Sequence, residues 1–122
     1  MEMLIVTFRL SGLADAAYRA NVEAMTPIFL DVPGLLGKTW LADPASKTYG
    51  GVYAFADRQS LEAYLASDIV KSMRANPHLD DMQTRAFGTI EDATRITHGL
   101  LPIAAQLSPP LLSESMSAGR HL

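Results

Sequence analysis

One stretch of the sequence, GKTWLADPASKTYGGVYAF (residues 37–55), gathers most of the side chains that could do chemistry. Residues two apart in a β-strand share a face, so Lys38 and Trp40 project together from the first half of this predicted hairpin. Four residues share a face of the returning strand: Tyr49, Gly51, Tyr53 and Phe55. Because a glycine leaves space beside a strand, the hairpin predicts either close packing of the indole ring or an aromatic-walled pocket for a flat ligand.

Lys38 is the first of four candidate catalytic residues, and its environment decides its role. An exposed strand lysine simply extends its ammonium group into water. A lysine buried beside Trp40 would have a lowered pKa, and it could then act as a base or bind an anionic ligand oxygen. The other three candidates are Tyr53, His78 and Arg85.

His78 and Arg85 each have two interpretations. His78 follows Pro77 in a predicted loop, where it is either an ordinary surface histidine or a residue that titrates near neutral pH. Arg85, on the last predicted strand, is either solvated or placed to bind a carboxylate or an enolate. The candidate substrate-binding residues are Trp40, Gly51, Phe55, Tyr18 and Tyr64.

The composition and the motifs narrow the classes of function. The chain has 122 residues, no cysteine and a formal net charge of −3, so a thiolate metal site is impossible and nucleic-acid binding is not expected. Its three histidines lack metal-ligand spacing, and no nucleotide-binding motif occurs, so we expect neither a metal nor a cofactor. The apolar start of the chain is too short for a signal peptide or a membrane span, which predicts a soluble, cytoplasmic protein.

Hydrophobic periodicity predicts the elements that would position these residues. Strands are indicated over four ranges: 3–10, 35–43, 47–56 and 81–90. Helical spacing indicates a helix within residues 13–31 that ends or kinks near Thr26, because Pro27 lacks a backbone donor. Asp57 and Ser67 can each cap a short helix before the fourth strand. This order predicts a ferredoxin-like βαββαβ sandwich, an α+β fold with a four-stranded antiparallel sheet and helices on one face.

The first predicted strand is apolar on both faces, although the helices would cover only one. A bare apolar sheet face on a small protein indicates an association surface, so we expect a homodimer in which the two sheets face each other. Residues 1–99 form the predicted domain. Residues 100–122 form an apolar tail, containing proline and serine, that we expect to be docked.

The stretch PGLLGKTWLADPASKTYGGVYAFADRQSLEAYL (residues 33–65) resembles the YdhR-type monooxygenases of bacteria. The similarity rests on Pro33-Gly34, the Lys38/Trp40 pair, Gly50-Gly51 followed by Tyr53 and Phe55, then Asp57 and the AYL at 63–65. It extends loosely over residues 1–99. That family belongs to the dimeric α/β-barrel superfamily, so the resemblance implies a homodimer of ferredoxin-like subunits. The superfamily includes cofactor-free monooxygenases, haem-degrading enzymes and lactone isomerases.

The resemblance leads to the hypothesis of a cofactor-independent monooxygenase that oxidises a small hydrophobic or aromatic substrate, phenolic or polyketide-like, with O2. A base would remove a phenolic or enolic proton, and the carbanion would then react with oxygen. Two alternatives stay open: a non-catalytic dimer that binds a small molecule, and an isomerase-like enzyme that transfers protons without oxygen. A buried Lys38, Tyr53 or His78 with a shifted pKa would favour an enzyme.

Overall fold

The computed structural model describes residues 1–99, which fall into two units that meet between Gly88 and Thr89. The first unit contains β1 (Glu2–Leu10), α1 (Asp15–Phe29), β2 (Leu35–Asp43), β3 (Thr48–Phe55), α2 (Arg58–Leu65), α3 (Asp68–Ala75) and β4 (Leu79–Gly88). The described part of the second unit contains α4 (Glu91–Ile96). The predicted tail, residues 100–122, lies outside the described residues. No helix within residues 1–99 is long and apolar enough to cross a membrane.

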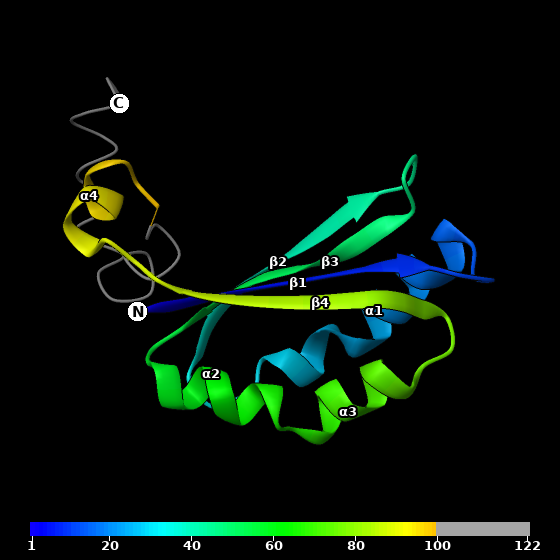
Figure 1. Cartoon of the computed structure of the whole chain (residues 1–122), viewed down its shortest axis with the longest axis horizontal. Coiled ribbons are helices and arrows are strands. Elements are labelled where there is room, and N and C mark those ends of the chain that lie inside the picture. Colours follow the sequence, from blue (N-terminus) through cyan, green and yellow to red (C-terminus); the bar gives the residue numbers. More distant parts are fainter. Residues whose placement is uncertain (100–122) are drawn as a thin grey trace. The chain divides into compact units, whose positions relative to one another are not determined.

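The four strands form one antiparallel sheet in the order β2-β3-β1-β4, and α1, α2 and α3 lie along one face of it (Figure 1). This arrangement confirms the predicted ferredoxin-like βαββαβ sandwich. β1 lies inside the sheet because apolar residues occupy both of its faces. Leu4, Val6 and Phe8 point toward the helices and are buried, whereas Met3 and Ile5 on the other face are half-buried.

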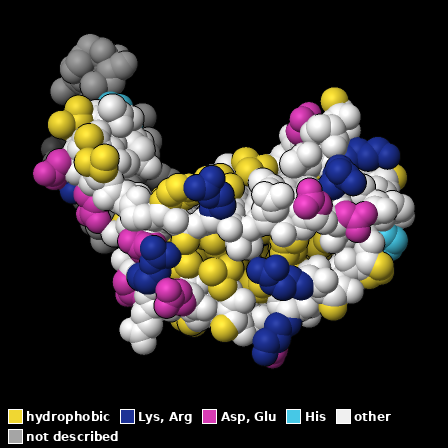
Figure 2. Space-filling model, in the orientation of Figure 1, with side chains coloured by type: hydrophobic (Ala, Val, Ile, Leu, Met, Phe, Trp, Pro, Cys, Tyr) yellow, Lys and Arg dark blue, Asp and Glu magenta, His cyan; other side chains and the backbone are white. Residues whose placement is uncertain are grey.

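The core between the sheet and the helices is built largely from aromatic rings. Tyr53 stacks on Phe55 with ring centroids 6.2 Å apart, and Tyr64 from α2 lies 5.0 Å from Tyr53. Phe29 reaches the same cluster from the last turn of α1. Full burial of each such side chain contributes roughly 1.5–3 kcal/mol. Figure 2 shows hydrophobic side chains between β4 and the helical layer, with lysine and arginine side chains among them.

Two boundaries differ from those that the sequence suggests. Helix α1 continues through Pro27 to Phe29, so it does not end near Thr26. Burial of the Phe29 ring offsets the backbone hydrogen bond that Pro27 cannot donate, and the last turn closes with short-range bonds such as that from the Leu30 amide to the Pro27 carbonyl. The fourth strand spans Leu79–Gly88 rather than 81–90, because its pairing with β1 already begins opposite Leu10.

The outer face of the sheet carries no helix within residues 1–88, as the sequence predicts. Its apolar side chains include Ile5 on β1, Val52 on β3 and Leu41 on β2, all half-buried. Phe87 on β4 is 40% exposed. These side chains form an apolar strip on the side of the sheet away from the helices, with Thr39 and Arg85 beside it in the strand register.

Candidate functional site

A cavity of about 420 Å³ lies between the inner face of the sheet and helices α1 and α3. Its apolar lining includes Phe8, Leu13, Tyr18, Val22, Met25, Phe29, Trp40, Tyr53, Ile69, Met73 and Leu79. The polar side chains that line it are Asn21, Lys38, Ser72 and Asn76. A concave, largely apolar space with a few polar groups is the usual form of a site for a small hydrophobic ligand.

Lys38 extends from β2 into a cage of three aromatic rings. Its Nζ lies 3.3 Å from the ring centroid of Trp40, 3.5 Å from that of Phe29 and 4.6 Å from that of Tyr53. Trp40 shares its strand face, Tyr53 is its partner in the register of β2 with β3, and Phe29 comes from α1. The period-two spacing of the hairpin therefore gathers Lys38, Trp40 and Tyr53 in one place.

The Lys38 ammonium has aromatic neighbours but no counter-ion within the described residues. None of the ion pairs found there includes it. Burial lowers the pKa of Lys38 to about 7, because an apolar surrounding disfavours the charged form. Near neutral pH a large fraction of this side chain is consequently a free amine, which can accept a proton.

Gly51 makes room for this lysine. Trp40 and Gly51 are opposite each other on paired strands, as the hairpin predicts. A Cβ at Gly51 would nevertheless lie 2.9 Å from Cε of Lys38 and 3.2 Å from Cε1 of Tyr53, with no indole atom among its nearest neighbours. The glycine therefore clears the path of the lysine stem rather than space for the tryptophan ring.

We expect Gly51→Ala to keep the fold, at a cost of about 1 kcal/mol, and to raise the pKa of Lys38. The added methyl would push Cε of Lys38 away from the sheet and toward water, where the ammonium is favoured. Titration of ¹³C-labelled lysine by NMR measures the change. Gly88→Ala is the matched control, because a Cβ there would meet only Oε2 of Glu2, at 3.3 Å. An unchanged Lys38 titration in Gly51→Ala would contradict this role of the glycine.

Tyr53 is the second polar group of the cage, and Tyr64 holds its hydroxyl. The Tyr64 hydroxyl donates a hydrogen bond of 3.0 Å to that of Tyr53. Burial raises the pKa of Tyr53 and of Tyr64, so both stay protonated near neutral pH. The bond from Tyr64 is the one side-chain hydrogen bond found at the Tyr53 hydroxyl within residues 1–99.

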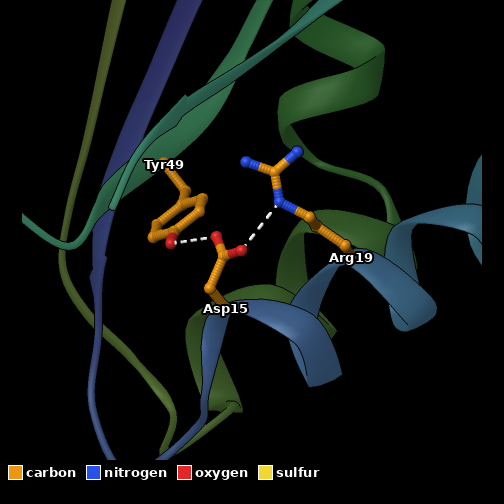
Figure 3. A network of polar contacts seen from close by, with 3 residues as sticks. All are labelled: Asp15, Arg19 and Tyr49. Atoms are coloured by element: carbon orange, nitrogen blue, oxygen red, sulfur yellow. Dashed lines mark hydrogen bonds and ion pairs between the residues drawn. The ribbon is translucent and has the colours of Figure 1, made fainter. Parts of the chain in front are cut away.

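The start of α1 is fastened to β3 by a polar network (Figure 3). The Tyr49 hydroxyl donates to Oδ1 of Asp15 at 2.5 Å, and Nε of Arg19 donates to Oδ2 of Asp15 at 2.9 Å. The Tyr49 bond lowers the pKa of Asp15 and raises that of Tyr49. Tyr18 packs on Tyr49 with centroids 4.7 Å apart, and burial raises the pKa of Tyr18 to about 12. The network thus positions Tyr18 as a neutral wall of the cavity.

The remaining candidates lie elsewhere. Phe55 and Tyr64 are core residues whose rings pack against Tyr53, and neither lines the cavity. His78 fastens the loop after β1, with Nδ1 2.8 Å from the Ser11 carbonyl oxygen. Arg85 is exposed on the outer face of the sheet, with its guanidinium carbon 5.1 Å from the ring centroid of Phe87. Neither His78 nor Arg85 lines the cavity.

The structure adds lining residues that sequence reasoning did not single out. Phe29 completes the cage around Lys38, and its signal was its place in the helical stripe that begins at Tyr18. Asn21 and Ser72 face the cavity from α1 and α3, and nothing in the sequence distinguishes them from other polar helix residues. Within residues 1–99, no three His, Cys, Asp or Glu side chains gather in a group that could hold a metal ion.

Solved structures that share this fold include the following three. NE2512, a protein of unknown function from Nitrosomonas europaea, is 22% identical, with a TM-score of 0.62 over 73% of this chain and 88% of that chain. SnoaB, a cofactor-independent oxygenase from Streptomyces nogalater, is 18% identical, with a TM-score of 0.57 over 74% of this chain and 93% of SnoaB. The heme-degrader MhuD from Mycobacterium tuberculosis is 16% identical, with a TM-score of 0.59 over 74% of this chain and 96% of MhuD. Identities this low establish the fold alone.

The sequence itself identifies the family. A search of curated proteins found no match. Residues 3–100 match the family described as "Putative mono-oxygenase ydhR". The matched range includes the four strands from Met3 onward, the helices and the residues of the Lys38 cage. The chain therefore belongs to the ydhR monooxygenase family, as the hairpin motif of residues 33–65 predicts.

Proposed function

We propose that this chain is a monooxygenase that oxidises a small aromatic or otherwise hydrophobic substrate with O2 and without a cofactor. The family supports monooxygenase chemistry, and the environment of Lys38 supports the finer assignment. An amine with a pKa of about 7, caged by three rings beside a 420 Å³ apolar cavity, suits the removal of a proton from a phenolic or enolic substrate. That single observation carries the proposal.

Lys38 acts as the base in this scheme. Its free amine takes a proton from the substrate hydroxyl or from an activated methylene group, and the resulting ammonium stays beside the anion. The anion transfers electrons to O2, and a carbon–oxygen bond forms. At an activated methylene, one oxygen atom ends in a new carbonyl group and the other leaves as water, so the substrate supplies the electrons.

Trp40, Phe29 and Tyr18 serve as the walls that hold a flat substrate. The Tyr53 hydroxyl, which lines the cavity and stays protonated, is a hydrogen-bonding group for a substrate oxygen. Asn21, Ser72 and Asn76 are the remaining polar contacts for substituents. His78 and Arg85 take no part in this scheme, because one fastens a loop and the other lies on the opposite face of the sheet.

We infer that two copies associate through the outer face of the sheet. No helix within residues 1–88 covers the apolar strip of Ile5, Val52 and Leu41, and Phe87 extends it on β4. An isologous pairing would bury the same strip on both subunits. Sedimentation equilibrium should give twice the chain mass, and Val52→Lys should shift it toward the monomer. A wild-type chain that stays monomeric at high concentration would overturn the dimer.

Oxygen uptake tests the catalytic proposal. Purified, metal-stripped protein, shown to be folded by circular dichroism, is incubated with a panel of anthrone-type and phenolic compounds in an oxygen electrode. We expect uptake that matches product formation one for one and that requires the protein. Product without oxygen uptake would identify a proton-transfer enzyme instead. Binding without any turnover across the panel would identify a non-catalytic binding protein.

A further inference from the structure

We propose that Lys38 is also a nucleophile that captures carbonyl compounds, and that the cavity binds aromatic aldehydes and ketones as imines on its Nζ. The inference goes beyond the oxygenase reaction, because no step in it uses oxygen. It would make the site a covalent trap for hydrophobic carbonyl compounds.

The first argument is the placement of the amine. Lys38 is one of the residues that line the cavity, together with the three rings around its Nζ, so a ligand in the cavity lies beside this side chain. No carboxylate among the described residues is paired with it to hold it as an ammonium ion. The rings of Phe29, Trp40 and Tyr53 surround Nζ at 3.5, 3.3 and 4.6 Å from their centroids, which limits the positions that Nζ can adopt. A confined amine loses little further freedom when it forms a bond.

The second argument is the charge state of the amine. Only the neutral form carries the lone pair that attacks a carbonyl carbon, and burial increases its share at neutral pH. Desolvated lysines in hydrophobic pockets are activated in this way for imine formation. Lys47 and Lys71 are both exposed, and they are the other two lysines of the chain.

The reaction balances without any added reagent. The Nζ lone pair forms a bond to the carbonyl carbon, the carbonyl oxygen takes up a proton, and a carbinolamine results. Loss of that oxygen as water then gives the imine. A mainly apolar lining excludes bulk water from the product and slows its hydrolysis.

The lining also defines the class of carbonyl compound. Trp40, Phe29 and Tyr18 offer ring faces and edges to a flat partner, and Met25 and Met73 offer adaptable apolar contacts. No acidic side chain lines the cavity among the described residues, so a cationic ligand would find no carboxylate partner there. Aryl aldehydes and conjugated aryl ketones fit this lining better than sugars or short aliphatic aldehydes.

Reductive trapping tests the inference on the intact chain. The protein is mixed with a low concentration of 2-naphthaldehyde and cyanoborohydride, under nitrogen, and the labelled lysines are located by peptide mass spectrometry. Each trapped imine adds the mass of the aldehyde less one oxygen atom. We expect labelling at Lys38 to be roughly tenfold or more faster than at Lys47 or Lys71.

Two comparisons make the outcome decisive. Acetaldehyde should label Lys38 with much less preference, because it gains little from the aromatic walls, and unfolding in urea should abolish the preference altogether. Labelling at Lys38 that is no faster than at Lys47 in the folded protein would overturn the inference. Because the reaction runs without oxygen, that failure would leave the oxygen-uptake result untouched, and absent oxygen uptake would leave this one untouched.

Discussion

Lys38→Met is expected to lower turnover about 100-fold or more and, at the same time, to make the protein more stable. The loss follows from removal of the general base, whose contribution is typically 10²–10⁴-fold. Methionine has a similar unbranched stem and brings no charge into the cage of Phe29, Trp40 and Tyr53. The gain in unfolding free energy should be about 1–2 kcal/mol at pH 7, after the lost cation–π contacts are allowed for.

The stability gain should depend on pH in a direction that the lysine pKa sets. The pKa of Lys38 is about 7 in the folded chain, against an ordinary value of 10.5. Between these values the unfolded chain binds the extra proton, so wild-type stability rises with pH across this window. The loss of unfolding free energy from burying the Lys38 ammonium is fully present below pH 7 and disappears toward pH 10.5. The stability difference between Lys38→Met and wild type should decrease over the same range.

Urea unfolding at several pH values, together with oxygen uptake, measures both effects. Lys71→Met is the matched control, because Lys71 is exposed on α3 and does not line the cavity. It should leave both turnover and stability close to wild type. A Lys38→Met variant that is destabilised at pH 7, or that keeps full turnover, would contradict the role given to the cage.

Gly50→Ala is expected to cost about 3 kcal/mol or more of unfolding free energy, a large part of the stability of a small domain. Gly50 has φ of +153°, which disfavours other residues, and a Cβ there would overlap the carbonyl oxygen of Val6 on the neighbouring strand. The nearest atoms belong to the backbone of β1 at the centre of the sheet, so no side chain can rotate away to relieve the clash.

The adjacent glycine is the control for this second prediction. A Cβ at Gly51 meets mainly the flexible Lys38 side chain, so Gly51→Ala should be far milder than Gly50→Ala in thermal unfolding. Equal melting temperatures for the two variants would show that the close approach of β3 to β1 is not a constraint. The two variants also distinguish the roles of the adjacent glycines. Gly50 allows close contact with the β1 backbone, and Gly51 leaves space for the Lys38 side chain.

The fold could be predicted well because its local signals agree with one another. The apolar residues on both faces of β1, the turn between the two hairpin strands and the Asp57 cap all favour the same topology. The Asp57 side chain does accept a hydrogen bond from the Ser60 amide. Pro27 misled the prediction of the α1 end, since tertiary burial of Phe29 outweighed a local rule. The start of β4 was missed because it depends on pairing with β1, which no local pattern records.

The site could be predicted only in part. Period two places Lys38 with Trp40, and the hairpin brings Tyr53 opposite, so the cage was accessible from sequence. The Phe29 ring could not be predicted as part of the cage, because its contact with Lys38 depends on how α1 packs across the sheet. The structure places Arg85 on the outer face of the sheet, away from the cavity, and residue type alone does not say which face of the sheet a strand residue takes.

The charge state of Lys38 tests the central claim most directly. NMR titration of protein labelled with ¹³C at the lysine Cε position follows each lysine separately, and Lys38→Arg identifies the resonance by its loss. We predict a midpoint of about 7 for Lys38 in the folded protein, shifted upward by unfolding in urea. A midpoint near the ordinary value of 10.5 would contradict the account, because an amine held as ammonium at neutral pH could serve neither as the base nor as the carbonyl trap.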